Sequence, residues 1–230
     1  MVINGLNKLT LLDYPGMVAC TVYTGGCNLR CPFCHNASLV LNKESQPLIS
    51  KEDFFAFLKK RKKVLEGVCV SGGEPTLNSD LNIFIKEIKL AGYKVKLDTN
   101  GTNPIMLNNL IESGLIDYVA MDIKNSIAKY GETVGIPNFD CLPIKKSTNI
   151  LMSSKIPYEF RTTVVKDFHN KEDLIKIGEW LEGAKAYYLQ QFVDSKNLIG
   201  DNLTPYKAEE LYNFCGQIKK YFKICEVRGV

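Results

Sequence analysis

The sequence predicts an α/β protein in which six strand–helix units form an open, partial (β/α)6 barrel. Apolar strand-like runs alternate with helical patterns along the chain, which is typical of a parallel sheet with right-handed crossovers. Six such units are two fewer than a closed eight-strand barrel contains. Polar residues follow each strand, as they do at the active face of parallel α/β folds. A doubly wound sheet is the alternative arrangement.

Six apolar or alternating runs are expected to form the parallel strands. Residues 93–98 alternate between apolar and polar side chains, as a half-buried strand does. Residues 158–165 are rich in β-branched and aromatic side chains, which favour strands. In chain order the expected strands span 17–24, 68–71, 93–98, 117–123, 158–165 and 186–192, and residues 223–229 form an extra strand.

The first two helices are expected where capping residues precede an apolar periodicity. Ser50 and Asp53 have the spacing of a capping box at the start of one helix. Asp80 opens the next helix, and Gly92 stops it, because glycine readily adopts the left-handed conformation of a helix C-terminus.

The later helices carry similar signals. Asn103 is an expected N-cap, and Pro104 occupies the first helical position. Proline suits this position because a backbone N–H there would have no partner within the helix. Thr204 and Pro205 are expected to start the last helix in the same way. Two further helices are expected, near 143–153 and at 171–181.

Composition and charge indicate a globular protein, which we expect to be a single domain spanning residues 1–230. The chain is 45% hydrophobic and 23% charged, with a net charge of +4. This mild net charge does not indicate a nucleic-acid-binding protein, which would show clustered basic residues. The one basic run, at 59–63, is expected to be the solvated end of a helix. No apolar run is long enough to span a membrane, and no signal-peptide pattern is present. We therefore expect a cytoplasmic protein with reduced cysteines.

Each of the six parallel strands runs into, or carries, residues that can take part in chemistry. Because the carboxyl ends of parallel strands lie at one edge, these residues are expected to meet at one mouth. They are, in chain order, Cys27, Cys31 and Cys34; the stretch "SGGEP" at 71–75; "DTNG" at 98–101; "MDIK" at 121–124; Arg161; and the pair Gln190 and Gln191, of which only one can face the mouth.

The three cysteines in "TGGCNLRCPFCHN" have the spacing C-x3-C-x2-C. A structural zinc site needs four ligands, and His35 is the only histidine nearby. Thiolates also hold iron–sulfur clusters, usually four at a time. A cubane held by three thiolates keeps one iron open to a substrate. This spacing favours a three-cysteine [4Fe–4S] cluster, with structural zinc as the alternative.

The stretch "CNLRCPFC" resembles the signature of the radical S-adenosylmethionine (SAM) enzymes, and "GGEP" matches the motif of that superfamily for the methionine amine. The stretches "CPFCHN", "SGGEP", "DTNG" and "MDIK" resemble the branch that activates glycyl radical enzymes. Within it, "LDYPG" at 12–16 and the final "CEVRGV" look most like activators of anaerobic ribonucleoside-triphosphate reductase. The resemblance covers essentially the whole chain and implies an open six-unit barrel of the radical SAM type.

The resemblance also implies the cofactors and the residues that hold them. A [4Fe–4S] cluster would be bound by Cys27, Cys31 and Cys34. On the adenine side, SAM would be contacted by Phe33 and His35, and near its amine by Gly72, Gly73 and Glu74. Lys124 and Arg161 would lie near its carboxylate or ribose. Asn100 and Gln190 would make further contacts with SAM. Glu74 would either anchor its own loop or meet the ammonium directly. Asp98, Thr99 and Asp122 match positions that hold a monovalent cation, for which hard oxygen ligands are suited.

The implied activity is reductive cleavage of SAM to a 5′-deoxyadenosyl radical, which then removes a hydrogen atom from a glycine of a partner enzyme. The expected partner is an anaerobic ribonucleoside-triphosphate reductase, and the expected electron donor is a flavodoxin or ferredoxin. The alternatives are a radical SAM enzyme acting on a small molecule, such as 7-carboxy-7-deazaguanine synthase, and a non-catalytic iron or zinc module. A second cluster is not expected, because the remaining cysteines, Cys20, Cys69, Cys141, Cys215 and Cys225, have no C-x2-C pairing.

Overall fold

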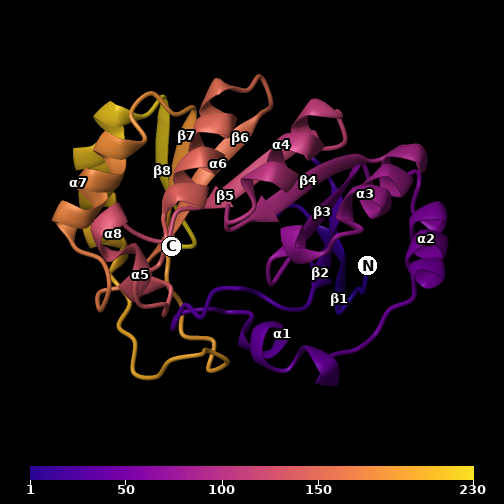
Figure 1. The fold of residues 1–230 in the computed structure, drawn as a ribbon, viewed down its shortest axis with the longest axis horizontal. Helices are drawn as coiled ribbons and strands as arrows, with labels where there is room; N and C mark the ends of the chain where they lie inside the picture. The colour runs from indigo at the N-terminus through magenta and orange to yellow at the C-terminus, as the bar shows by residue number, and fades with distance from the viewer. The chain divides into compact units, whose positions relative to one another are not determined.

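The computed structural model describes residues 1–230 as an α/β fold built on eight strands (Figure 1). The strands form one mostly parallel sheet, ordered from β1 to β8 as along the chain, and the sheet does not close. The predicted open α/β architecture is therefore confirmed, with the six predicted units at β2 to β7. The chain divides into two compact units: residues 1–28, 38–99 and 103–120, and residues 29–37, 100–102 and 121–230. The assignment of a single domain stays a prediction.

The strands of the first unit bring their carboxyl ends to one edge. β1 (Gly5–Thr10) pairs antiparallel with β2 (Ala19–Thr24). β2 then pairs parallel with β3 (Gly67–Gly72), and β3 with β4 (Lys94–Thr99). The register sets Thr24 opposite Gly72, so both strands end level. β5 (Tyr118–Asp122) begins in this unit and ends in the second.

Helices cover the strands of the first unit on their outer side (Figure 1). They are α2 (Lys51–Lys60), α3 (Leu81–Leu90) and α4 (Pro104–Glu112). The unit also contains most of the short α1 (Ala37–Leu41) and 3₁₀ turns at Lys43–Ser45 and Pro75–Leu77. Phe54 of α2 packs on Phe84 of α3 with ring centroids 5.5 Å apart. Both predicted caps are confirmed: the Ser50 and Asn103 side chains accept from the backbone N–H groups of Asp53 and Met106.

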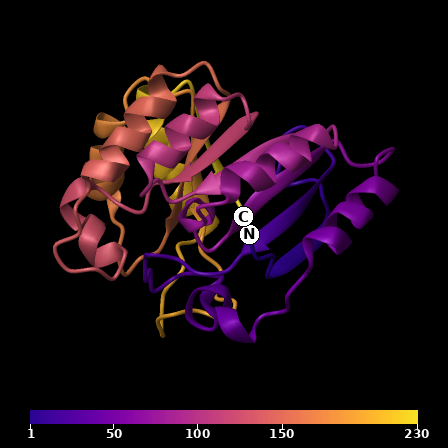
Figure 2. The ribbon, with the colours of Figure 1, turned by 45° about the vertical axis from the view of Figure 1, so that its right-hand side comes forward.

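The second unit repeats this arrangement with three parallel strands (Figure 2). They are β6 (Tyr158–Val164), β7 (Ala186–Gln191) and β8 (Ile224–Arg228). The helices are α5 (Tyr130–Thr133), α6 (Leu142–Ser153), α7 (Lys171–Trp180) and α8 (Ala208–Ile218), with 3₁₀ turns at Ile127–Lys129 and Lys219–Tyr221. A capping box opens α7, in which the Asn170 and Asp173 side chains each accept from the other residue's backbone N–H at 3.0 Å.

The predicted start of the last helix at Thr204 and Pro205 is wrong. α8 begins at Ala208, and the Lys207 N–H donates to the Glu210 carboxylate at 2.8 Å. Pro205 instead forms an antiparallel bridge with Val165. Next to it, the Thr204 carbonyl accepts from the Lys166 N–H at 3.0 Å. Proline has no backbone N–H. This is tolerated in the first turn of a helix, and it is equally tolerated in a bridge that needs no N–H donor at that residue.

The structure also describes the burial of two further cysteines and of the basic run, whose expected exposure is confirmed. Cys20 and Cys69 are fully buried in the strands of the first unit, and no cysteine forms a disulfide. The basic run at 59–63 is exposed at and beyond the end of α2. No helix combines the length and the apolar character needed to cross a membrane.

The Ser50 cap gives a direct test of the fold in the first unit. Ser50→Ala removes the acceptor of the Asp53 N–H, which lies 3.0 Å from the serine oxygen. Such a change lowers the free energy of unfolding by about 1 kcal/mol. Urea denaturation should show this loss, whereas the matched change at the exposed Ser79 should leave the midpoint unchanged. Equal midpoints for both variants would contradict the capping role.

Candidate active site

Two loops of the first unit touch through their backbones where β2 and β3 end. The Gly73 N–H donates to the Thr24 carbonyl, and the Glu74 N–H donates to the Gly26 carbonyl, both at 2.8 Å. A side chain at Gly73 would collide with the Gly26 backbone, and Gly72, with a φ of 120°, could not carry one without striking Thr24. Glycine is required at both positions because the backbones approach so closely. This contact fixes the "GGEP" loop against the residue that precedes Cys27.

Glu74 is a fully buried carboxylate that holds this loop in shape. Its Oε1 accepts from the Thr76 N–H at 3.0 Å and from the Thr99 hydroxyl at 2.8 Å, and the Thr76 hydroxyl also donates to it. A buried charge is tolerated when several donors satisfy it. Of the two roles expected for Glu74, these contacts match the loop anchor.

Asp98 ends β4 beside the same loop. Its Oδ2 accepts from the Ser71 hydroxyl at 3.0 Å, and its Oδ1 pairs with the ammonium of Lys96. The next residues, Asn100 to Thr102, belong to the second unit. There the Asn100 Oδ1 accepts from the backbone N–H and hydroxyl of Thr102, at 3.0 and 2.7 Å. The polar side chains of "DTNG" thus have partners within the protein.

The cysteine loop is held by backbone contacts on both sides of the unit boundary. Cys27 belongs to the first unit, whereas Cys31 and Cys34 belong to the second. In the second unit, a turn joins the two cysteines through a bond of 3.0 Å from the Cys34 N–H to the Cys31 carbonyl. The Arg30 N–H donates to Val134, and the Pro32 carbonyl accepts from Gly200. Neither unit by itself contains three or more His, Cys, Asp or Glu side chains grouped as metal ligands.

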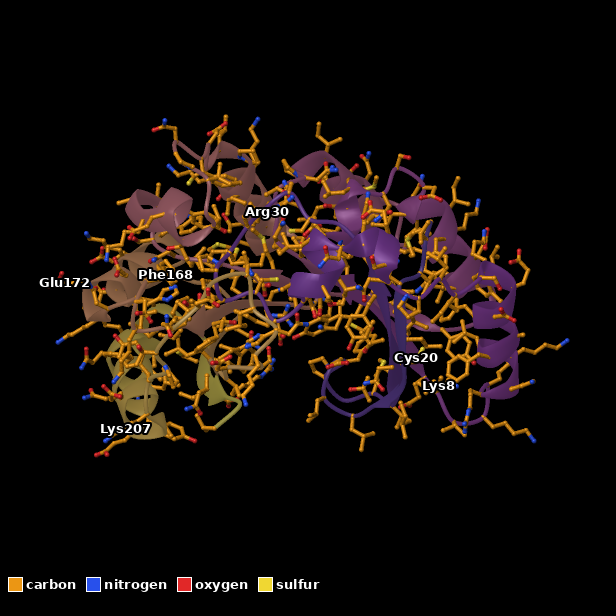
Figure 3. The ribbon with its side chains drawn as sticks, turned by 90° about the horizontal axis from the view of Figure 1, so that it is seen from below. Lys8, Cys20, Arg30, Phe168, Glu172 and Lys207 are labelled. Atoms are coloured by element: carbon orange, nitrogen blue, oxygen red, sulfur yellow. The ribbon has the colours of Figure 1, made fainter.

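Aromatic contacts fix the residues that flank the third cysteine. Phe33 is buried, and its ring centroid lies 5.7 Å from that of Phe168 and 6.1 Å from that of His169. His35 stacks on Phe192 at 5.7 Å, and its Nε2 lies 2.8 Å from the Val193 carbonyl oxygen. Figure 3 shows Phe168 among the packed side chains, whereas Glu172 lies at the periphery. The loop therefore has a firm apolar support.

Asp122 lies between two cations at the end of β5. Its Oδ2 is 2.9 Å from the Lys124 ammonium, and its Oδ1 is 2.9 Å from Arg161 Nη2 and 3.0 Å from Arg161 Nε. Burial would raise the pKa of Asp122, but the charges of Lys124 and Arg161 outweigh it and lower this pKa to about 2. Burial likewise opposes the charge on Lys124, yet Asp122 and Cys31 raise the pKa of its ammonium. Two cations against one carboxylate leave this site net positive.

The strand register places Gln190 with Arg161. Thr163 of β6 is opposite Gln190 of β7, and Thr163 lies two residues beyond Arg161. Because strand side chains alternate, Arg161 and Gln190 share one face of the sheet. Gln191 points to the other face, where its amide donates to the Tyr206 carbonyl at 3.0 Å. The role of Gln190 toward a cofactor stays a prediction.

Two residues near the site were not anticipated. His169 is buried; its Nδ1 accepts from the Val165 N–H at 3.1 Å, so its Nε2 carries the proton that is donated to the Lys124 carbonyl at 2.7 Å. Lys96 is buried beside Asp98. The sequence does not mark His169, because the Lys124 carbonyl that fixes its Nε2 lies 45 residues away along the chain. Lys96 had a signal: a lysine two residues before Asp98 lies on the same strand face.

Comparison with known proteins relates these features to a family. The model of the radical SAM superfamily matches residues 21–181. A Methanocaldococcus jannaschii protein with the provisional name of glycyl-radical enzyme activating enzyme is 34% identical over 235 residues, which cover 99% of this chain and 96% of that protein. The pyruvate formate-lyase-activating enzyme of Staphylococcus epidermidis is 29% identical over 191 residues, which cover 78% of this chain and 74% of that enzyme.

A solved structure shares the fold. The crystal structure of Streptococcus suis SuiB bound to S-adenosylmethionine superposes with a TM-score of 0.68 at 16% identity. The match covers 90% of this chain and 49% of SuiB, so the chain spans about half the length of that protein. At this level of identity the likeness concerns the fold alone.

The lowered pKa of Asp122 predicts a dependence of stability on pH. A carboxyl group whose pKa falls from 3.8 to about 2 on folding stabilises the folded state above pH 3.8, and this contribution is lost as the pH falls toward 2. It amounts to about 2 kcal/mol at neutral pH, of which about half is lost by pH 3.

Urea denaturation of the wild type and Asp122→Asn between pH 6 and pH 3 measures this effect. The difference in unfolding free energy should shrink as the pH falls. As a control, Asp201→Asn at an exposed position should differ little from the wild type in unfolding free energy at every pH. A difference for Asp122→Asn that stays constant down to pH 3 would show that the Asp122 carboxylate is not stabilised by its cations.

Proposed function

Because the chain belongs to the radical SAM superfamily and is related to glycyl-radical enzyme activating enzymes, we propose that it cleaves SAM reductively and generates a glycyl radical on a partner enzyme. One observation carries this proposal. The backbone contact between Gly26 and the "GGEP" loop sets the first cysteine of the C-x3-C-x2-C run beside a glycine-lined strand end.

The donor chemistry of the cysteine loop fits an iron–sulfur cluster. Cys27, Cys31 and Cys34 are thiols on one loop, and none is consumed in a disulfide. We propose that they hold a [4Fe–4S] cluster. Three thiolate ligands leave one iron without a protein ligand, which is the opening that a chelating substrate needs. When bound, the cluster supplies the electron for cleavage of the SAM sulfonium bond.

We propose that residues of both units bind and orient SAM. The backbone at Gly72 and Gly73 can approach the methionine amine closely because no side chain intervenes. The net positive group of Asp122, Lys124 and Arg161 suits the methionine carboxylate, since a charge-assisted hydrogen bond is stronger than a neutral one. We assign the adenine side to Phe33 and His35, which flank the third cysteine, and further SAM contacts to Asn100 and Gln190.

The partner is proposed to be an anaerobic ribonucleoside-triphosphate reductase, with a flavodoxin or ferredoxin as electron donor in the cytoplasm. Support comes from "LDYPG" at 12–16 and the C-terminal "CEVRGV", which resemble activators of that reductase. A glycine on an extended loop suits the reaction, because no side chain shields its Cα.

Electron paramagnetic resonance tests the proposal. The anaerobically reconstituted protein, reduced and mixed with SAM and the cognate reductase, should produce the doublet of a glycyl radical. Cys27→Ala, Cys31→Ala and Cys34→Ala should each abolish the doublet and the release of 5′-deoxyadenosine. Cys141→Ala, outside the loop, should retain both.

The outcomes separate the family chemistry from the partner. Release of 5′-deoxyadenosine without a doublet would contradict the reductase as the partner and favour a small-molecule substrate. Full SAM cleavage by any of the three loop variants would contradict the cluster assignment.

A further inference from the structure

Lys96 is a lysine buried inside β4, with 1% of its surface exposed. Its ammonium pairs with Asp98, lies 3.9 Å from the Cys69 sulfur, and lies 6.0 Å from the centre of the Tyr118 ring. An ammonium group loses much solvation free energy on burial, so lysine is almost never buried without a partner. Asp98, two residues along the same strand face, supplies the opposite charge that makes this burial tolerable.

The Lys96–Asp98 pair also reaches the loop after β3. The Ser71 hydroxyl donates to the second Asp98 oxygen at 3.0 Å, and Ser71 directly precedes the two glycines of the "GGEP" loop. The ammonium thus fixes the carboxylate of Asp98, and that carboxylate fixes the end of β3. Charge-assisted hydrogen bonds of this kind are short and directional.

The expected monovalent cation does not fit this arrangement. Its predicted ligands were Asp98, Thr99 and Asp122. The negative charge of Asp98 is already balanced by Lys96, and the Thr99 hydroxyl donates to Glu74 at 2.8 Å. In the second unit, Asp122 is balanced by Lys124 and Arg161. A cation is attracted by uncompensated carboxylate charge, and these carboxylates retain little negative charge that is not already paired.

We propose that Lys96 is a positioning residue that takes the role of this cation, as a permanent counter-ion of Asp98 within the protein. SAM binding and the stability of this strand end are therefore independent of Na⁺ and K⁺. The inference rests on the proposed function in placing SAM at these strand ends. Its test needs no glycyl radical enzyme, so its failure is distinguishable from failure of the proposed function.

The wild-type protein provides the first test. The anaerobically reconstituted protein is placed in NaCl, KCl or tetramethylammonium chloride at equal ionic strength, and its thermal unfolding midpoint and SAM dissociation constant are measured. The midpoints should coincide, and the dissociation constants should agree within about twofold. A saturable rise of the midpoint with Na⁺ or K⁺, or about tenfold tighter SAM binding, would overturn the proposal.

Lys96→Met provides the second test, because it keeps the length of the side chain and removes the charge. In tetramethylammonium chloride this variant should bind SAM about tenfold more weakly than the wild type, and Na⁺ or K⁺ should recover much of the loss. The control is Lys94→Met on the same strand; its ammonium is exposed and lies 3.0 Å from Asp117, and the variant should behave as the wild type does. A Lys96→Met variant that does not respond to Na⁺ or K⁺ would overturn the proposal.

The double variant Lys96→Met/Asp98→Asn covers the case in which the single variant fails to fold. Removing both charges should restore folding and leave no difference between the salts. If the second substitution fails to restore folding, the role of Lys96 is not to compensate the charge of Asp98, and the proposal is overturned.

Discussion

The site depends on one close backbone contact, between the loop after β2 and the loop after β3. The Glu74 N–H donates to the Gly26 carbonyl at 2.8 Å, and a side chain at Gly73 would collide with the same residue. Because Cys27 follows Gly26 directly, the contact sets the start of the cysteine loop relative to the strand end that is proposed to bind the methionine amine. The level register of Thr24 and Gly72 makes the contact possible, since it brings the two strand ends to the same height.

Charge compensation is the second theme of the site. Glu74 is satisfied by threonine donors, Asp98 by Lys96 and Ser71, and Asp122 by Lys124 and Arg161. Glu74 is fully buried, whereas Asp98 and Asp122 are partly buried, and the partners of each offset the cost of removing its charge from water. The result is a set of strand ends preorganised by the protein itself. Among these three groups, only that of Asp122, Lys124 and Arg161 carries excess positive charge.

Much of this arrangement could be predicted from local sequence, because local physics decides it. Ser50 and Asn103 cap their helices with their own side chains, and the cysteine spacing is visible within eight residues. Features that depend on partners distant in the sequence are harder to predict. Pro205 reads as a helix start, but a bridge to Val165 overrides it. His169 was missed because its Nε2 donates to the carbonyl of Lys124, which is distant in the sequence. The roles of the site residues toward SAM rest on resemblance and stay proposals.

The proposed function depends most on transfer of a hydrogen atom from a glycine Cα to the 5′-deoxyadenosyl radical, which yields 5′-deoxyadenosine and a glycyl radical, and isotope transfer tests this step most directly. The cognate reductase would be prepared with glycine deuterated at Cα and incubated anaerobically with the reduced protein and SAM. Mass spectrometry of the released 5′-deoxyadenosine should show one deuterium, matched in amount by the glycyl radical. 5′-Deoxyadenosine without deuterium, formed while the reductase gains a radical, would contradict the account, because the hydrogen atom would then come from another source.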